Sequence, residues 1–346
     1  DKITKVILEG EDYKIFDVTT IHPEAIKIAI KNDVRTFNFK SIAVAPLKVH
    51  NNINGYLFTA RQNDSSFNAD EIKSIGAFAD FASVALENAK LIKESIEKER
   101  LEKEFDVARD IQRKILPTTI PSSDLLHISA LFVPAFEVGG DFYDFFELDK
   151  DRLGFVVADV SGKGISAAFI MAEVKGIFES LSKLIFNPRE LLINVNGILK
   201  NSLDKKNFVT AIYGVINKKT GVLNFARAGH TPIHICSGEK IERLQPAGIG
   251  LGLDFTTGFT ASIKEMEIQL KNNDIVICYS DGIPEAKNNL EEDFGYDRLD
   301  SSILKNNNMD LDLISNNIMR ELTVFSKNHS QHDDITLVLF KWNQNK

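Results

Sequence analysis

Hydrophobic and polar positions alternate in three different ways along the chain, and each pattern predicts a different kind of element. In residues 1–66 the apolar runs are short. Lys40–Val49 and Asn54–Gln62, separated by an Asn-rich turn, predict a β-hairpin. The stretch His22–Ile30 predicts a helix with Pro23 in its first turn. Because no group of catalytic residue types occurs here, we expect a small α/β regulatory or dimerisation domain.

A helical period replaces this alternation over residues 68–116. Asn68 followed by Glu71 predicts a capping box, with Asn in place of Ser or Thr. Apolar stripe positions then follow in two runs that are separated by a five-residue step, namely Ala85, Ala89, Ile92 and Ile96, then Leu101, Phe105, Ala108, Gln112 and Ile115. A helix this long and polar outside one stripe needs a partner. We expect a parallel dimeric coiled coil; the alternative is packing against its own domain. Pro117 ends the helix.

The remaining segment, residues 122–346, alternates strand runs with two helical stretches, at about Ser166–Ile185 and Pro188–Leu203. Six strand runs follow, and their sequences are FVTAIYGVI, GVLNFARAG, PIHIC, FTASIKEMEI, DIVICYS and DITLVLFKW. Strands that are grouped apart from helices predict an α+β fold, an antiparallel β-sandwich flanked by helices, rather than a doubly wound sheet.

Composition narrows the function classes. The chain of 346 residues has room for two domains. Its net charge of -8 and pI of about 5.5 argue against a nucleic-acid partner. No apolar run approaches the roughly 20 residues that span a bilayer, so we expect no membrane partner. Cys236 and Cys278 lie in strand runs, and we expect buried reduced thiols in a cytoplasmic protein. No signal-peptide pattern opens the chain.

Candidate chemistry gathers at four aspartates that stand at strand ends, which are Asp141, Asp159, Asp281 and Asp333. The runs 142–148 and 153–160 flank a turn. A hairpin centred between Lys150 and Asp151 places residue 141 opposite residue 160. Asp141 and Asp159 are then about 5–8 Å apart. If the strands beside Asp281 and Asp333 are antiparallel neighbours, those two acids share one sheet edge.

Carboxylates at one edge repel one another unless a cation neutralises them. Hard oxygen donors suit Mg²⁺ or Mn²⁺, and no Cys/His set has the spacing of a zinc site. The expected nucleophile is metal-bound water held by Asp159 and Asp281. Taken alone, Asp281 is equally typical of a turn, and Asp333 with Asp334 is typical of a solvated pair. The occurrence of all four acids together favours the cation site.

Seven segments resemble, in order, the serial motifs of the PPM-type (protein-phosphatase-2C-like) serine/threonine phosphatases, and more narrowly their bacterial SpoIIE-type branch, which acts on regulators of sigma factors. They are VGGDFYDFF, ADVSGKGISAA, FVTAIYGVI, ARAGHTP, YSDGIPEA, FGYDRL and HDDITLVLF. The resemblance covers about residues 105–341. The preceding sequence resembles the end of a GAF domain and its linker. This implies a partial GAF-like regulatory domain over 1–90, a helical dimerisation linker over 68–116 and a phosphatase domain over 117–346.

The resemblance also implies a ligand set for two or three Mn²⁺ or Mg²⁺ ions, namely Asp141, Asp159, Val160, Asp281 and Asp333. In it Asp159 bridges two metals, and Val160 contributes its backbone carbonyl. Asp333 rather than Asp334 matches the first position of the family's Asp-Asp/Asn-x-Thr element.

Four further features have two interpretations each. Lys163 either replaces the phosphate-binding arginine of the eukaryotic relatives, which has no clear counterpart here, or is an exposed turn residue. His230 is a general acid or a structural histidine. His332 either contributes to the site behind the ligands, for which its position beside Asp333 is the only evidence, or has no role there. The segment Pro246–Gly252 is a mobile rim loop or a plain turn.

The prediction is therefore a metal-dependent phosphatase for phosphoserine or phosphothreonine on a protein. The resemblance implies a regulator of the anti-sigma-antagonist type as the substrate. We hypothesise that movement of the dimeric helix 68–116 repositions the helix 166–185 and with it Asp159. Two rivals stay open: a non-catalytic interaction module that keeps the fold, and a metal-dependent hydrolase for small phosphoesters.

Overall fold

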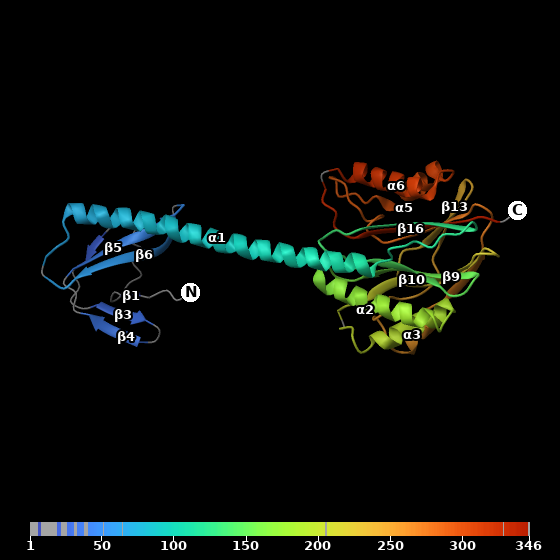
Figure 1. Cartoon of the computed structure of the whole chain (residues 1–346), viewed down its shortest axis with the longest axis horizontal. Coiled ribbons are helices and arrows are strands. Elements are labelled where there is room, and N and C mark those ends of the chain that lie inside the picture. The colour runs from blue at the N-terminus through green and yellow to red at the C-terminus, as the bar shows by residue number, and fades with distance from the viewer. Residues whose placement is uncertain are drawn as a thin grey trace. The chain divides into compact units, whose positions relative to one another are not determined.

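The computed structural model describes residues 6–7, 19–21, 26–30, 33–37, 41–50, 52–63, 65–204, 206–327 and 329–344 (Figure 1). The chain consists of two compact units, Asp1–Glu102 and Lys103–Lys346. Within the described ranges, no helix is both long enough and apolar enough to cross a bilayer.

The first unit contains two small antiparallel sheets. One has the order β1-β3-β4, with bounds Val6–Ile7, Ile26–Ile30 and Asp33–Phe37. The other has the order β2-β5-β6, with bounds Thr19–Ile21, Ser41–Val49 and Asn52–Arg61. The predicted hairpin is confirmed as β5–β6. The predicted helix over 22–30 is wrong for Ile26–Ile30, where alternating isoleucines form β3; residues 22–25 lie outside the described residues.

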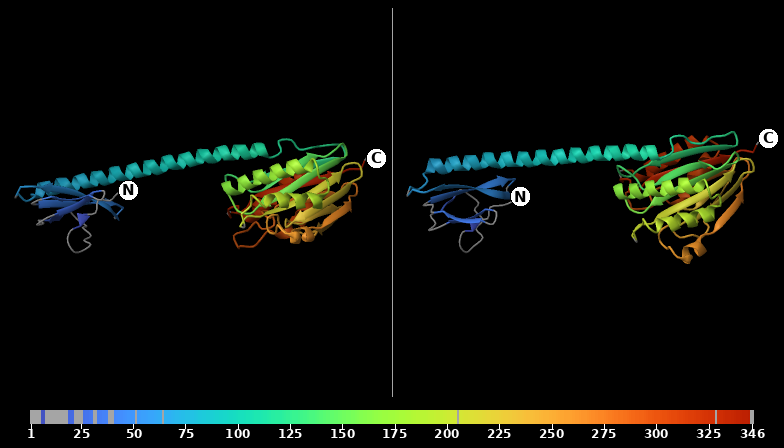
Figure 2. Two further views of the ribbon diagram at one scale, coloured as in Figure 1. Left: turned by 90° about the horizontal axis from the view of Figure 1, so that it is seen from below. Right: turned by 60° about the horizontal axis from the view of Figure 1, so that its bottom comes forward.

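Helix α1 (Ala69–Ile115) begins as the sequence predicts. The Asn68 N–H donates to Glu71 Oε2 at 2.9 Å, and the Glu71 N–H donates to Asn68 Oδ1 at 2.9 Å, which is a capping box. In the first unit, Ile75 and Ala79 are buried against the sheet that contains β5 (Figure 2). The end of the helix belongs to the second unit.

The prediction that the second apolar run of α1 faces a partner helix is wrong for its last residues. Gln112 is only 4% exposed and binds the backbone of its own unit, and Ile115 packs on a core that includes Leu116. These positions therefore follow the alternative interpretation, packing against the helix's own domain. The five-residue step between the runs thus separates an exposed run from one that begins exposed at Leu101 and becomes buried at Gln112.

The second unit is a four-layer sandwich. Its two stacked antiparallel sheets have the orders β14-β11-β10-β9-β8 and β13-β12-β15-β16-β7. Helices α2 and α3 cover the first sheet, and α5 and α6 cover the second (Figures 1 and 2). The predicted α+β architecture is confirmed.

The bounds in the first sheet are β8 Phe142–Glu147, β9 Arg152–Val160, β10 Val209–Asn217, β11 Val222–Ala228 and β14 Glu265–Gln269. Those in the second are β7 Leu126–Val133, β12 Ile233–Ser237, β13 Lys240–Leu244, β15 Ile275–Tyr279 and β16 Ile335–Trp342. The helices are α2 Ile165–Ser182, α3 Pro188–Leu199, α4 Thr257–Ser262, α5 Gly295–Asn306 and α6 Leu311–Ser326.

The hydrophobic pattern did not predict β7, β13, α4, α5 or α6. The predicted strand run FTASIKEMEI is wrong over residues 259–262, which belong to α4, and it is confirmed only where β14 begins at Glu265. The buried residues of α6 include Leu311, Ile314, Ile318 and Leu322, a spacing that is a clear helical signal. Apolar strand runs on both sides obscured it. Side chains of both sheets, including Phe155, Phe225 and Phe340, fill the layer between them.

The hairpin β8–β9 differs from the prediction by one residue. Phe142 pairs with Ala158, so residue 141 falls opposite residue 159 rather than 160. The turn is centred on Lys150 because the Leu148 N–H donates to the Arg152 carbonyl at 3.1 Å. Asp141 and Asp159 consequently stand directly across from each other.

Candidate metal centre

The four predicted acids reach one end of the two stacked sheets. Asp141 directly precedes β8, and Asp159 lies near the end of β9 in the first sheet. Asp281 follows β15 and Asp333 precedes β16 in the second. The pairing of Tyr279 with Leu337 confirms that β15 and β16 are antiparallel neighbours. Both pairs of acids are therefore brought to the same region.

Burial and mutual repulsion perturb these acids strongly. Burial, and then the charges of Asp281 and Asp333, raise the pKa of Asp159 from 3.8 to about 7. Burial, and then Glu285 and Asp333, raise the pKa of Asp281 to about 6. The pKa of Asp141 lies well above its ordinary value, first because of burial and then because of Asp159. The cluster thus concentrates negative charge where water compensates it poorly.

The chemistry of the donors fits a hard divalent cation, because every side-chain donor is a carboxylate oxygen. In the part of the chain that the structure describes, no three His, Cys, Asp or Glu side chains converge closely enough to hold a metal ion. Asp333 Oδ2 instead lies 3.2 Å from Lys163 Nζ. Because the pKa values of Asp159 and Asp281 are raised, their ionised forms would be stabilised by a nearby positive charge such as a bound cation.

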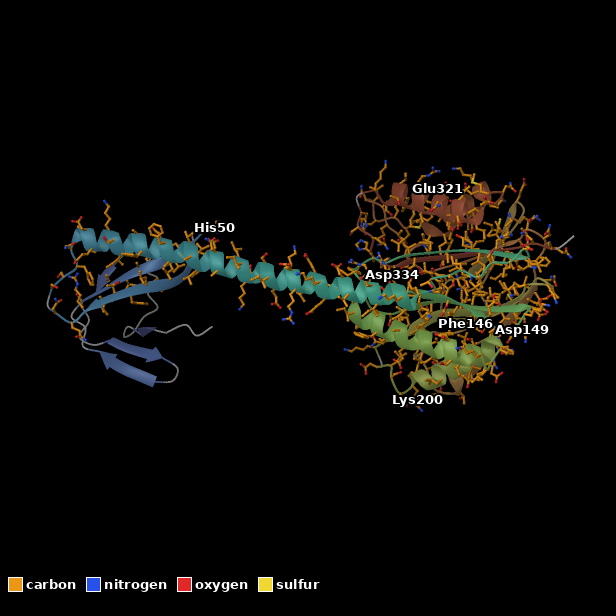
Figure 3. The ribbon with its side chains drawn as sticks, in the orientation of Figure 1. His50, Phe146, Asp149, Lys200, Glu321 and Asp334 are labelled. Atoms are coloured by element: carbon orange, nitrogen blue, oxygen red, sulfur yellow. The ribbon has the colours of Figure 1, made fainter. Side chains whose placement is uncertain are left out.

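Asp333 and Asp334 differ sharply in their surroundings. The Asp333 side chain is 45% exposed. Asp334 is 6% exposed, and its carboxylate accepts the N–H groups of Ala135 at 2.8 Å, Gly140 at 2.6 Å and Asp141 at 3.3 Å (Asp334 is labelled in Figure 3). Backbone donors from a distant loop occupy both oxygens of Asp334, whereas Asp333 Oδ1 accepts only the N–H of its neighbour Asp334 at 2.9 Å and Oδ2 lies beside Lys163.

Close packing around this carboxylate requires glycine. A Cβ on Gly139 would lie 2.2 Å from Asp334 Oδ2, and a Cβ on Gly282 would lie 2.0 Å from the Asp334 carbonyl oxygen. A Cβ on Gly140 would lie 2.8 Å from the Val160 carbonyl oxygen, the predicted backbone ligand. These glycines let the loops carrying the acids approach one another.

Two hydroxyl residues that the pattern analysis missed support the acids. Thr336 Oγ1 donates to Asp141 Oδ2 at 2.7 Å. Ser280 Oγ donates to the Asp334 carbonyl at 3.1 Å and accepts the Thr336 N–H at 2.9 Å. Their positions inside the motifs around Asp281 and Asp333 were the only signal in the sequence.

Comparison with known proteins identifies the family. The family model described as Stage II sporulation protein E (SpoIIE) matches residues 149–343, more than half of the chain. The chain belongs to the SpoIIE family. The phosphoserine phosphatase RsbU of Bacillus subtilis (strain 168) is 30% identical over 191 residues, which are 55% of this chain and 56% of RsbU.

Solved structures agree with the SpoIIE family assignment at the level of the fold. The SiaA-PP2C domain of Pseudomonas aeruginosa superposes with a TM-score of 0.64 at 22% identity, over 71% of this chain and 99% of that domain. RsbX in complex with magnesium gives a TM-score of 0.50 at 16% identity, over 65% of this chain and 99% of RsbX. The fold is therefore PP2C-like. The chain spans about half the length of the curated relatives it matches, 56% and 42% for the first two.

The remaining candidate residues of this SpoIIE-family chain take different positions. Lys163 is 46% exposed beside Asp333, and its ammonium also donates to the His332 carbonyl. His230 is 3% exposed, with Nδ1 2.7 Å from Thr210 Oγ1. Burial, and then the nearby Arg227, lower the pKa of His230 to about 3, so it is neutral at pH 7. This favours the structural interpretation, since a neutral imidazole is a poor general acid.

The segment Pro246–Gly252 is anchored rather than free. Its Gly248 carbonyl accepts the Gly229 N–H at 3.1 Å, and Leu251 exchanges two backbone hydrogen bonds with Val209 at 2.9 and 2.8 Å. These contacts favour the plain turn. His332 is exposed, its backbone carbonyl accepts a hydrogen bond from the Lys163 ammonium, and its ring packs against that of His329 at 4.6 Å between centroids.

Proposed function

We propose that this chain is a Mn²⁺- or Mg²⁺-dependent protein serine/threonine phosphatase. The observation that carries the proposal is the cluster of acids at one end of both sheets, with the pKa of Asp159 raised to about 7 and that of Asp281 to about 6. Membership of the SpoIIE family, the name of RsbU and the magnesium in the RsbX structure support it. The residues that would hold two or three metal ions are Asp141, Asp159, Asp281 and Asp333, with the Val160 carbonyl.

Bound metal ions would supply an activated water and neutralise the phosphoryl oxygens. The chain itself supplies the arrangement. Asp159 and Asp281 come from different sheets and hold the nucleophile's position between them. Thr336 orients Asp141 through its hydroxyl, and Asp334 holds the backbone on which Asp141 stands. Lys163 places a positive charge at the exposed edge, where the phosphate of a substrate would enter.

The proposed substrate is phosphoserine or phosphothreonine on a signalling protein, of the anti-sigma-antagonist type. The support is the family assignment and the name of RsbU, a phosphoserine phosphatase. The retention of all four acids weighs against a purely non-catalytic module. The rival proposal is that the natural substrate is a small phosphoester. Comparing the turnover of a phosphoprotein with that of a small phosphoester distinguishes the two.

We propose further that α1 joins two copies. Phe78 and Phe81 are 69% and 77% exposed and lie on a helical face that adjoins the one that buries Ile75 and Ala79. Ala85, Ala89, Ile92 and Ile96 continue this face at three- and four-residue intervals, so it forms an apolar stripe that a second α1 would cover. Residues 1–90 would then act as a partial GAF-like regulatory domain, 68–116 as the dimerisation linker and 117–346 as the phosphatase domain.

The test of the catalytic proposal is hydrolysis of p-nitrophenyl phosphate with Mn²⁺ by the wild type, Asp159→Asn and Asp281→Asn. We expect losses of at least about a hundredfold in both variants, because each removes a charged ligand. Asp124→Asn, which changes an exposed acid away from the site, is the matched control. Equal rates in all four proteins would overturn the proposal. A phosphoserine protein turned over no better than the small ester would favour the rival substrate class.

A further inference from the structure

The last turns of α1 are bonded directly to the loop that carries Asp141. Gln112 Nε2 donates to the Gly139 carbonyl at 2.7 Å, and Gln112 Oε1 accepts the Gly139 N–H at 3.0 Å. The Gln112 side-chain amide thus pairs with both the N–H and the carbonyl of Gly139, as the backbone of a neighbouring β-strand would. Gln112 is 4% exposed, so water does not compete for this pair.

Side chains from two distant segments hold three consecutive N–H groups of this loop. Gln112 in α1 takes that of Gly139, and Asp334 before β16 takes those of Gly140 and Asp141. The position of Asp141 is therefore set jointly by α1 and by the carboxylate of Asp334. The adjoining Gly140 also lies against the Val160 carbonyl. A displacement of Gly139 would therefore move Asp141 relative to Asp159 and would change the approach of Gly140 to the Val160 carbonyl.

A second contact makes the attachment sensitive to the register of the helix. Arg109, three residues before Gln112, donates through Nε to the Glu137 carbonyl at 3.2 Å. Positions three apart share one face, and a shift by one residue rotates that face by about 100° and moves it by about 1.5 Å. Such a shift would break both contacts together. The loop can thus follow α1 directly, without a movement of α2.

We propose that Gln112 is a positioning residue that couples α1 to the metal centre by holding Gly139, and through it Asp141. The inference rests on the proposed function, because it assigns a metal affinity to the acids. It differs from the movement of helix 166–185 considered above, since the attachment precedes β8 and involves no α2 residue. The element that would act on the metal centre through Gly139 is the chain's own helix α1.

The experiment measures Mn²⁺ binding by calorimetry on the full chain, with Gln112→Met and Gln112→Glu. Methionine keeps the length of the side chain and loses both hydrogen bonds. Glutamate keeps the acceptor, but sets an oxygen against the Gly139 carbonyl. We expect the dissociation constant for Mn²⁺ to rise about tenfold in both, which corresponds to 1.4 kcal/mol. At saturating Mn²⁺ we expect kcat to return to within about twofold of wild type.

Lys114→Ala is the matched control, an exposed residue on the same turn of α1, and it should leave the affinity unchanged. The unfolding midpoint of each variant in EDTA, followed by Trp342 fluorescence, verifies that it is folded. A lowered midpoint with an unchanged Mn²⁺ affinity would mean a merely structural Gln112 and would overturn the inference. If the wild type binds no Mn²⁺, or Asp159→Asn binds it equally well, the proposed function itself fails.

Discussion

The adjacent acids Asp333 and Asp334 allow one chemical change to be made in two environments. Asp→Asn at either position removes one negative charge and nearly preserves the shape of the side chain. Asp334 Oδ1 accepts from Ala135, while Oδ2 accepts from Gly140 and Asp141. An asparagine there has one acceptor oxygen, so its NH₂ group must face at least one backbone N–H.

The cost of Asp334→Asn follows from these contacts. Hydrogen bonds to a charged acceptor contribute about 1.5–3 kcal/mol each, and a buried donor left facing another donor adds to the loss. We expect about 3 kcal/mol of destabilisation, which in a domain of this size lowers the melting temperature by roughly 6–12 °C. The removed charge also relieves repulsion on Asp141 and Asp159, but burial dominates both pKa shifts, so this gain is smaller.

Asp333→Asn should behave in the opposite way. Asp333 is 45% exposed and makes an ion pair with half-exposed Lys163. Such pairs contribute about 0–1 kcal/mol, so we expect a melting temperature within about 3 °C of wild type in EDTA. As a proposed metal ligand, however, its loss should reduce Mn²⁺-dependent activity by about a hundredfold or more.

Trp342 provides the assay, because it is the only tryptophan and is 3% exposed in β16, so its fluorescence reports on the second unit. Melting in EDTA and phosphatase activity against Mn²⁺ concentration are measured on both variants. The assignment of the two acids is refuted if Asp334→Asn melts like the wild type while Asp333→Asn melts far below it. It is equally refuted if Asp333→Asn keeps full activity.

The remaining predictions concern four other positions. In EDTA, the folded protein keeps the Asp159 proton up to a pKa of about 7, while the unfolded chain loses it near 3.8, so stability should fall as pH rises from 4 to 7. Melting curves of Asp159→Asn should show a shallower fall, and an identical pH slope would contradict this. His230→Asn should destabilise the fold by about 1–2 kcal/mol, seen as a melting temperature a few degrees lower, and should leave the pH profile of kcat unchanged. If one limb of that profile disappears in the variant, His230 acts as a general acid after all. Gly140→Ala should weaken Mn²⁺ binding, since its Cβ would lie 2.8 Å from the Val160 oxygen, and calorimetry with an unchanged affinity would contradict this. Phe81→Glu should convert dimers to monomers in light scattering, and a wild type that is already monomeric would contradict the proposed dimer.

Local sequence signals predicted several features well. The capping box at Asn68 depends only on residues three apart, and the hairpin β5–β6 depends on neighbouring runs, so both could be read along the chain. Acids at strand ends signalled the candidate site. The prediction of a helix was wrong at Ile26–Ile30, because alternating isoleucines there favoured a strand. The register of β8–β9 failed by one residue because the loop geometry sets the centre of the turn.

The apolar runs of α1 show a different limit. Periodicity identified both runs as stripes, but a stripe is equally apolar whether it faces a partner or its own domain. Gln112 could not be assigned until the chain brought Gly139 back against the helix. A polar Gln112 is favourable within that stripe because its amide hydrogen-bonds the buried backbone of Gly139.

The sequence by itself determined the α+β class, the ends of α1 and the residue types of a hard-cation site, because these follow from local periodicity and donor chemistry. Only the tertiary structure decided how Asp333 and Asp334 differ. The two are the same residue type at adjacent positions. The N–H groups that occupy Asp334 come from Ala135, Gly140 and Asp141, more than 190 residues earlier. Their approach depends on the stacking of the two sheets, which no local pattern encodes.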